Sequence, residues 1–243
     1  SPDFRKHSAS HMLDTFLTYH DRQQFEVYCY ANVPYPDDYT EKFRQLADHW
    51  HNILGITDEK AADLIHQDHI DILVDPGVGH TSNHRLLVFA YKPAPIQVTL
   101  NMFDLGLQRI DYRISDRFLD PPDQLVPDEV KIHYLSHYFI YSPPKVETPL
   151  RVSLPYEQNG YITFGCFNNF MKINSFVIHT WAQILLQCPR SRLLLKSSFK
   201  IECSETLSRF FALFTAQGIP VDRLQFLPFS ASKEEHLTLY DQI

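Results

Sequence analysis

The chain has 243 residues, with 22 lysines and arginines against 29 aspartates and glutamates, and a formal net charge of −7. This negative balance argues against a nucleic-acid-binding surface. The sequence has no apolar run of transmembrane length and no signal-peptide pattern, so we expect neither a nucleic acid nor a membrane as partner.

The cysteines indicate the cellular compartment of the protein, and the two ends of the chain indicate whether it is part of a longer polypeptide. The four cysteines are Cys29, Cys166, Cys188 and Cys203, and none belongs to a CxxC pair. We therefore expect free buried thiols in a reducing compartment, which indicates a cytoplasmic protein. The chain opens abruptly at Ser1, and its last residues keep a helical pattern with no cap, Gly or Pro to end it. These ends predict a fragment of a longer polypeptide.

Strand-like and helical segments alternate through the first part of the chain. Helical spacing covers residues 8–20, residues 40–50 with Thr40 as a possible N-cap, and residues 57–67. Strand composition covers residues 25–31, 70–75, 96–100 and 110–114. The run IDILVD at 70–75 is typical of a strand buried on both faces.

Residues 116–160 differ in character, because they hold many prolines and little periodicity. We interpret residues 146–160 as a linker between an N-terminal lobe, residues 1–145, and a C-terminal lobe, residues 161–243. In the second lobe, expected strands at 161–165, 192–196 and 223–227 alternate with expected helices at 175–187, 204–217 and from 233 onward. The alternation predicts an α/β fold with parallel sheets in two Rossmann-like units, the second incomplete.

The junction after the strand at 161–165 is a candidate binding site. In the run YITFGCFNNFMK, Asn168, Asn169 and Lys172 stand where a loop turns into the next helix. A helix N-terminus carries exposed N–H groups and a partial positive charge, and a lysine there adds a full charge. The junction therefore suits a phosphate or diphosphate at the carboxyl end of a parallel strand. The alternative is a solvated lysine beside polar turn residues.

Two more loops follow predicted strands. The sequence GHT, which contains His80, follows the run IDILVD, and His80 either points into a cleft or belongs to a polar turn. After the run LQFLPF, Ser232 and Glu235 have the spacing of a capping box. Lys233 and His236 in that segment either face a nucleotide or belong to an ordinary helix start.

His7 and His11 are four residues apart and would share one face of a helix. A metal is conceivable there, but the general base of an HExxH motif is absent, because residues 8–10 are Ser-Ala-Ser. A role as general base stays open for one of them, since histidine titrates near neutral pH, and so does a surface position. The sequence also lacks a DxD motif, so we expect no metal site.

Taken together, these segments resemble the catalytic region of the protein O-GlcNAc transferase family, especially its bacterial members with tetratricopeptide repeats. The matching text runs through nearly the whole chain in order: SPDFRKHSASHML, QFEVYCYANV, IHQDHIDILVD with GHT, NHRLLVFAYKPAPIQVT, IDYRISD, YITFGCFNNFMKI, SRLLLK and SASKEEHL. The resemblance implies a fold of the GT-B type, in which two Rossmann-like domains face a cleft.

The resemblance also implies a reaction and assigns residues. Members of the family move a sugar, usually GlcNAc from UDP-GlcNAc, onto Ser or Thr with inversion, and need no metal or other cofactor. His7 matches the family's candidate base, and His80 matches a bacterial histidine proposed to act near the reaction centre. The residues that match donor-binding positions are Asn169, Lys172, Ala231, Lys233 and His236.

We therefore expect a protein O-GlcNAc transferase whose partners are a nucleotide sugar and a protein Ser/Thr acceptor. A Spindly-like O-fucosyltransferase that uses GDP-fucose remains an alternative. A degenerate or truncated non-catalytic binding module is another. It is favoured by the sequence LNMFDLG at 100–106, which stands where the family has a Gly-Tyr-Pro-x-Thr-Thr-Gly loop, and by the lack of the family's Asn-Gly-x-Thr-Thr segment.

Overall fold

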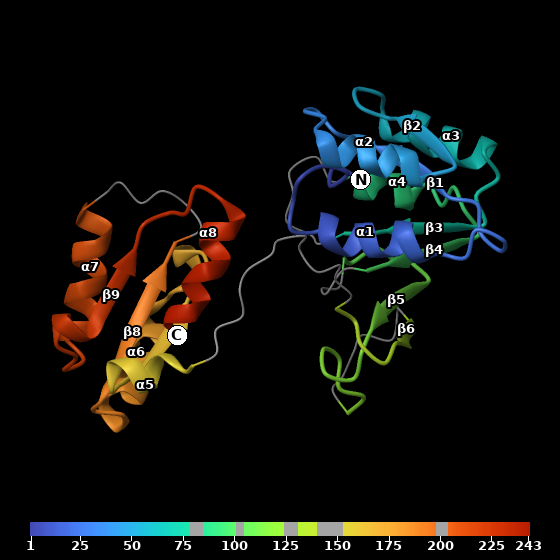
Figure 1. The fold of residues 1–243 in the computed structure, drawn as a ribbon. Coiled ribbons are helices and arrows are strands. Elements are labelled where there is room, and N and C mark those ends of the chain that lie inside the picture. The colour runs from blue at the N-terminus through green and yellow to red at the C-terminus, as the bar shows by residue number, and fades with distance from the viewer. Residues whose placement is uncertain (78–84, 101–104, 124–130, 140–152, 198–203) are drawn as a thin grey trace. The chain divides into compact units, whose positions relative to one another are not determined.

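The computed structural model describes residues 1–77, 85–100, 105–123, 131–139, 153–197 and 204–243. The chain divides into two compact units, Ser1–Pro144 and Lys145–Ile243. Both units consist of parallel strands and helices (Figure 1). The mixed α/β fold with parallel sheets that the alternation predicted is therefore confirmed.

The first unit contains two parallel sheets in its described part. A two-stranded sheet pairs β1 with β2, and a four-stranded sheet has the order β3-β4-β5-β6. The elements in chain order are α1 (Ser10–Tyr19), β1 (Tyr28–Ala31), α2 (Asp38–Leu46), β2 (His49–Asn52), α3 (Asp58–Gln67), β3 (Ile72–Asp75), α4 (Leu86–Ala90), β4 (Ile96–Thr99), β5 (Tyr112–Ser115) and β6 (Lys131–Tyr134).

One helix end in this unit was predicted wrongly and one strand was not predicted, for identifiable reasons. The helix expected over 40–50 ends at Leu46, and β2 follows, because His49 to Asn52 pair with β1 and the His49 ring stacks on Tyr28 at 4.1 Å. Pairing with β1 decides the structure of residues 49–52, because the helical spacing of apolar residues is only a weak local preference. The strand β6, at 131–134, lies in a stretch whose sequence carries too little periodicity to predict it.

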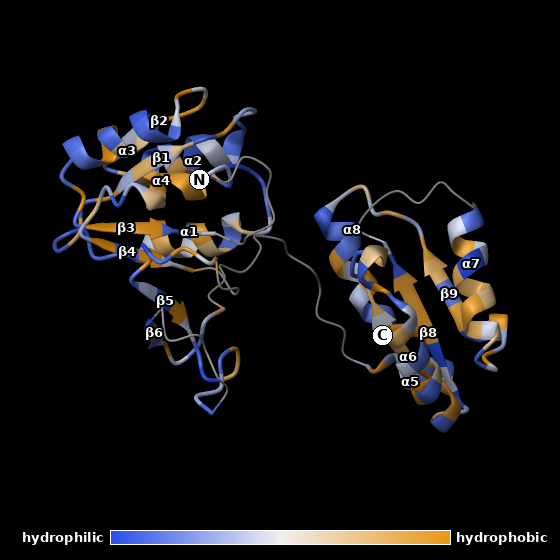
Figure 2. Cartoon of the chain, turned by 180° about the vertical axis from the view of Figure 1, so that it is seen from behind, coloured by the Kyte–Doolittle hydropathy of each residue, from blue (hydrophilic) through white to orange (hydrophobic). Residues whose placement is uncertain are grey.

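The strand β3 is buried on one face only, whereas its apolar run predicted burial on both. Leu73 and Asp75 are buried, but Ile72 is 46% exposed and Val74 is 45% exposed. Leu73 packs in a core that includes residues of α3 and α4, and the alternate side chains point the other way. Figure 2 shows the apolar character of both β3 and β4. Composition alone does not distinguish these two cases.

Helix α2 begins at an acidic cap rather than at Thr40. The Asp37 carboxylate accepts hydrogen bonds from the backbone N–H of Tyr39 and of Thr40, at 3.0 and 3.1 Å. Thr40 occupies the third helical position, and its hydroxyl accepts a bond from the Asp37 backbone N–H, which completes a capping box. The Asp37 carboxylate also accepts a bond of 2.7 Å from Lys6 N–H and thereby ties the N-terminal segment to α2.

We predict that Asp37→Ala lowers the free energy of unfolding by about 1–2 kcal/mol, because an N-cap is lost. Burial raises the pKa of Asp37, but the backbone N–H donors outweigh it and hold the pKa below its ordinary value. The stabilisation is therefore present above the unfolded-state pKa and disappears as pH falls through the lower folded-state pKa. Denaturant unfolding at neutral and acidic pH measures both effects. Exposed Asp63→Ala is the control, and equal losses in both variants at neutral pH would contradict the cap.

The second unit has one three-stranded parallel sheet in the order β7-β8-β9. Its elements are α5 (Pro155–Asn159), β7 (Ile162–Cys166), the 3-10 turn η1 (Phe170–Lys172), α6 (Ser175–Gln187), β8 (Ser191–Lys196), α7 (Ser204–Thr215), η2 (Val221–Arg223), β9 (Leu224–Leu227), α8 (Lys233–Thr238) and η3 (Leu239–Gln242). The helix α5 lies inside the segment expected to be an irregular linker. Pro155 begins it, and Gly160 ends it with a φ of 69°.

The core of the second unit lies between the sheet and the helices α6 and α7. Leu193 and Leu195 of β8 pack in one cluster with Ile178 and Leu185 of α6 and with Phe214 of α7. The central strand of the sheet is thus the most deeply buried one. The loops that follow the three strands lie at one edge of the sheet, because the strands are parallel.

Candidate functional site

Lys172 is presented to solvent by the buried side chains on either side of it. Phe170 and Ile173 are buried in the core of the second unit, and the Phe170 ring packs edge-on against Phe210 with centroids 5.1 Å apart. Met171 and Lys172 between them are exposed. Among the described residues, the Lys172 ammonium has no hydrogen-bond or ion-pair partner. The loop is therefore anchored while its charge remains available to a ligand.

Two asparagines set the path from β7 to α6. The Asn169 side chain accepts a hydrogen bond of 3.0 Å from Met171 N–H and caps the 3-10 turn η1. The Asn174 side chain caps α6 by accepting a 3.0 Å bond from Val177 N–H. Lys172 is thus the last residue of a separate turn, three positions before α6, and not part of that helix. The first turn of α6 has no acidic residue, so its positive end is not neutralised by its own side chains.

The loop after β9 forms only half of the expected capping box. The Ser232 hydroxyl accepts a bond of 3.1 Å from Glu235 N–H. The Glu235 carboxylate, however, accepts its bond from Ala231 N–H at 2.8 Å and not from Ser232 N–H. Lys233 is the first residue of α8 and is exposed. The bond to Glu235 folds the Ala231 segment back over the start of α8.

His236 is the residue through which the loops at this edge meet. Its ring lies 5.8 Å from the ring of Phe167, which follows β7, and 5.7 Å from the ring of Tyr240 in η3. Its Nδ1 atom lies 3.1 Å from the Nζ atom of Lys196, the last residue of β8. The ends of β7 and β8 and the helix after β9 therefore converge on one imidazole.

Lys196 also belongs to this cluster, although it is not among the residues expected from the sequence to form the site. It is 3% exposed, and its ammonium lies 5.6 Å from the centroid of the Phe229 ring. Burial lowers the pKa of Lys196, while the negative charge of Glu235 raises it in part. The signal was available, because a lysine ends the apolar run SRLLL at the ligand-binding edge of a parallel sheet.

The expected donor residues share this edge of the second unit but differ in their contacts. His236 is joined to the loop after β7 and to the central strand by the contacts described above. The hydrogen bonds of Asn169 and of the Ala231 backbone stay within their own loops.

His7 lies in the first unit, in the turn before α1 and not on the helix itself. Its Nδ1 atom accepts a bond of 3.3 Å from Ala9 N–H and lies 3.5 Å from a carboxylate oxygen of buried Asp3. The side chain is partly exposed. Nε2 can accept a proton in the other tautomer, which carries its hydrogen on Nδ1 beside the Asp3 carboxylate. His80, the rival base, lies outside the described residues.

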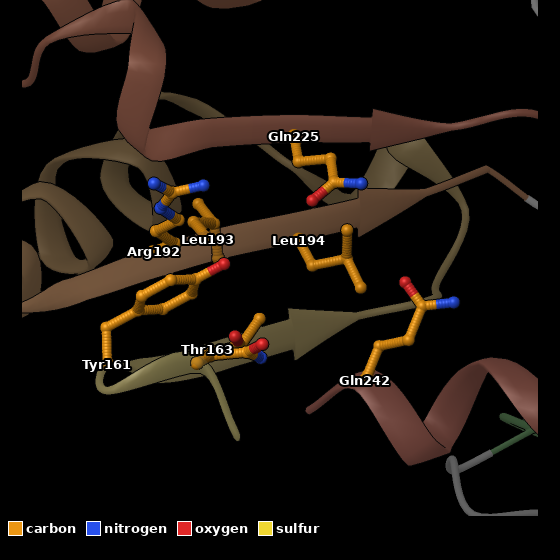
Figure 3. A pocket seen from close by; sticks show the side chains of 8 residues that line it. Tyr161, Thr163, Arg192, Leu193, Leu194, Gln225 and Gln242 are labelled. Atoms are coloured by element: carbon orange, nitrogen blue, oxygen red, sulfur yellow. The ribbon is translucent and has the colours of Figure 1, made fainter. Parts of the chain in front are cut away.

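The described residues contain no group of three or more side chains that could hold a metal ion. A pocket of about 250 Å³ lies on the sheet of the second unit, and its lining contains none of the expected donor residues (Figure 3). Its lining includes Thr163 of β7, Arg192 of β8, Gln225 of β9 and Gln242 of η3. The Arg192 guanidinium stacks over Tyr161, at 4.3 Å from the ring centroid. Tyr161 immediately precedes β7, and Arg192 is the second residue of β8. These two residues therefore lie at the amino ends of the strands, opposite the edge that carries Lys196 and His236.

Comparison with known proteins identifies the family. Residues 1–146, more than half of the chain, match the description of glycosyl transferase family 41. The chain belongs to glycosyl transferase family 41. The catalytic-region resemblance seen in the sequence is thereby confirmed, and it extends past the matched span, because curated relatives align over nearly the entire chain.

Two plant relatives and one solved structure show the extent of the similarity. The Arabidopsis thaliana protein described as probable UDP-N-acetylglucosamine–peptide N-acetylglucosaminyltransferase SPINDLY is 35% identical over 99% of this chain and 27% of its own length. The SEC protein of the same plant, described as the same kind of probable transferase, is 29% identical over 98% of this chain and 25% of its own length. The chain thus spans about a quarter of these relatives.

The solved structure is a lysine-to-methionine mutant of the Thermobaculum terrenum O-GlcNAc transferase. It has a TM-score of 0.86 and 34% identity, and the match covers 100% of this chain and 46% of that chain. This agreement confirms that the α/β fold is of the GT-B type expected for family 41. The part of the chain that the structure describes has no helix long and apolar enough to cross a membrane.

Proposed function

We propose that this chain supplies catalytic machinery to a protein O-GlcNAc transferase that moves GlcNAc from UDP-GlcNAc to Ser or Thr hydroxyls. The observation that carries the proposal is the alignment of almost the whole chain with relatives described as UDP-GlcNAc–peptide transferases. Those descriptions name GlcNAc, and nothing in the site favours the fucose alternative. The cations at the carboxyl edge of the β7-β8-β9 sheet suit a nucleotide diphosphate in chemistry and in place.

In this proposal the second unit binds the donor. The exposed Lys172 ammonium meets the diphosphate, whose negative charge grows as the bond from the anomeric carbon to the leaving phosphate oxygen breaks. Asn169 contacts the donor beside Lys172, and Ala231, Lys233 and His236 hold the nucleoside. Because the reaction is a displacement with inversion, the acceptor oxygen forms its bond to the opposite face of the anomeric carbon.

The first unit supplies the base. The acceptor hydroxyl loses its proton as it attacks, and Nε2 of His7 receives that proton. This role requires the tautomer with its hydrogen on Nδ1, which lies 3.5 Å from a carboxylate oxygen of Asp3 that can accept it. UDP leaves with the electrons of the broken bond. UDP-GlcNAc is a substrate, and the proposal requires no metal or other cofactor. We further propose a cytoplasmic setting and a longer polypeptide with tetratricopeptide repeats, as in the family members that the sequence resembles.

The test uses the longest natural polypeptide that contains this chain, a Ser/Thr peptide library, and either UDP-GlcNAc or GDP-fucose. We expect the peptide mass to rise by one N-acetylhexosamine with UDP-GlcNAc and to stay unchanged with GDP-fucose. Addition of a metal chelator should leave the rate unchanged. A deoxyhexose mass gain from GDP-fucose would assign the other sugar, and no transfer from either donor would favour a binding module.

A further inference from the structure

Lys196 is a buried cation with an unusual partner. Among the described residues no carboxylate lies within ion-pairing distance of its ammonium, and its hydrogen-bond partner there is Nδ1 of His236 at 3.1 Å. The Phe229 ring lies on it at 5.6 Å. Lysine has three N–H donors and no acceptor, so Nδ1 of His236 must be the acceptor of this bond. That requirement places the imidazole proton on Nε2 and leaves the ring neutral.

We propose that Lys196 is a positioning residue that holds His236 as the neutral imidazole with its proton on Nε2, so that this N–H is offered as a donor to the bound nucleotide. The assignment of a nucleotide as ligand rests on the proposed function, whereas the state of the imidazole does not. Lys196 itself acts through His236, because its side chain is enclosed at the end of the central strand.

The surroundings of His236 agree with this role. The rings of Phe167 and Tyr240 pack against it from two other elements and limit its rotation. The titratable or charged groups around it are Lys196 on β8, Tyr240 on η3 and Glu235 beside it on α8. Burial lowers the pKa of His236, and the positive charge of Lys196 lowers it further.

A carboxylate in the place of Lys196 would favour a charged imidazole at His236 instead of a neutral one. Paired with an acid, an imidazole binds a proton more tightly and carries a charge near neutral pH. Paired with an ammonium, it stays neutral with one defined tautomer. A fixed N–H then meets a carbonyl, hydroxyl or phosphate oxygen of the nucleotide without adding a second buried charge.

The first test needs no ligand. Two-dimensional ¹⁵N–¹H correlation spectra of the imidazoles, with the His236 signals assigned by loss in His236→Gln, report tautomer and pKa directly. In the wild-type chain we expect the Nε2–H tautomer and a pKa below the ordinary value. A wild-type His236 that is charged at pH 7, or that carries its proton on Nδ1, would overturn the proposal by itself.

Variants then assign the cause. Lys196→Met keeps the length of the side chain but removes the charge and the donor, so the pKa of His236 should rise and both tautomers should be populated. Lys196→Arg keeps the charge and the donor and should retain the Nε2–H tautomer. Lys60→Met, at an exposed position in the first unit, should change nothing. An unchanged tautomer and pKa of His236 in folded Lys196→Met would refute the positioning role.

The second test asks whether the positioned group reaches the nucleotide. We expect UDP to bind the Lys196→Met variant about 10- to 100-fold more weakly in calorimetry, the loss typical of one charge-assisted hydrogen-bond arrangement. His236→Gln should lose a similar factor, and the double variant should lose little more. His236 could show the expected tautomer and pKa while UDP binds neither the wild-type chain nor any variant. That result would refute the donor-site proposal and leave the positioning role of Lys196 intact.

Discussion

Lys172→Ala should lower the rate of sugar transfer by roughly a hundredfold to a thousandfold, the loss that follows removal of one electrostatic donor to a developing charge. The Lys172 ammonium faces solvent at the end of η1, while Phe170 and Ile173 hold the loop in place. In the proposed role, the contact of Lys172 with the diphosphate strengthens as the sugar–phosphate bond breaks, so the loss should fall mainly on kcat rather than on KM.

The melting temperature of the Lys172→Ala variant distinguishes a role of Lys172 in sugar transfer from a role in folding. Lys172 fills no cavity, so the melting temperature of the Lys172→Ala variant should match that of the wild type. Lys172→Arg should not restore full activity, because a planar guanidinium presents its charge differently from a compact ammonium. Lys60→Ala, in the first unit, is the control for loss of one exposed lysine. Turnover at the wild-type rate in Lys172→Ala would make Lys172 a solvated residue of the turn.

The helices and strands of the second unit could be predicted from the sequence more accurately than those of the first, because several of them are longer. The helix expected over 175–187 has these bounds in the structure, and the strand expected over 192–196 begins one residue earlier. Both are long, strongly patterned segments. The strands β2 and β6 have four residues each, and pairing with a neighbouring strand determines them more than their composition does.

Some features of the candidate site could likewise be predicted from the sequence, and others could not. The loops that carry Lys172 and Lys233 could be placed at one edge from sequence, because carboxyl ends of parallel strands share an edge. The hydrogen bond between Lys196 and His236 could not, because it joins residues 40 positions apart and depends on the depth of β8 in the core. The bond from Ala231 N–H to Glu235 was likewise unpredictable, since the same side chains also satisfy a regular capping box.

The edge of the β7-β8-β9 sheet that carries Lys196 and His236 rests on the core of the second unit. Phe214 is the side chain that tests this dependence. Phe214, in α7, is 0% exposed and packs in the cluster that contains Leu193 and Leu195 of the central strand. Truncation of a fully buried phenylalanine costs about 3–5 kcal/mol, because apolar contact is lost and a cavity remains. Total stabilities are about 5–15 kcal/mol, so this loss is a large share of what holds the unit folded.

We therefore expect Phe214→Ala to lower the free energy of unfolding by about 3–5 kcal/mol in denaturant titrations. Amide exchange should accelerate in β7, β8 and β9, and UDP affinity should fall as the edge that carries His236 loses its support. The matched control is Phe176→Ala, the same truncation at a position that is 75% exposed in α6, with an expected change within about 0.5 kcal/mol. Equal losses of stability in the two variants would show that the packing around Phe214 does not support the sheet.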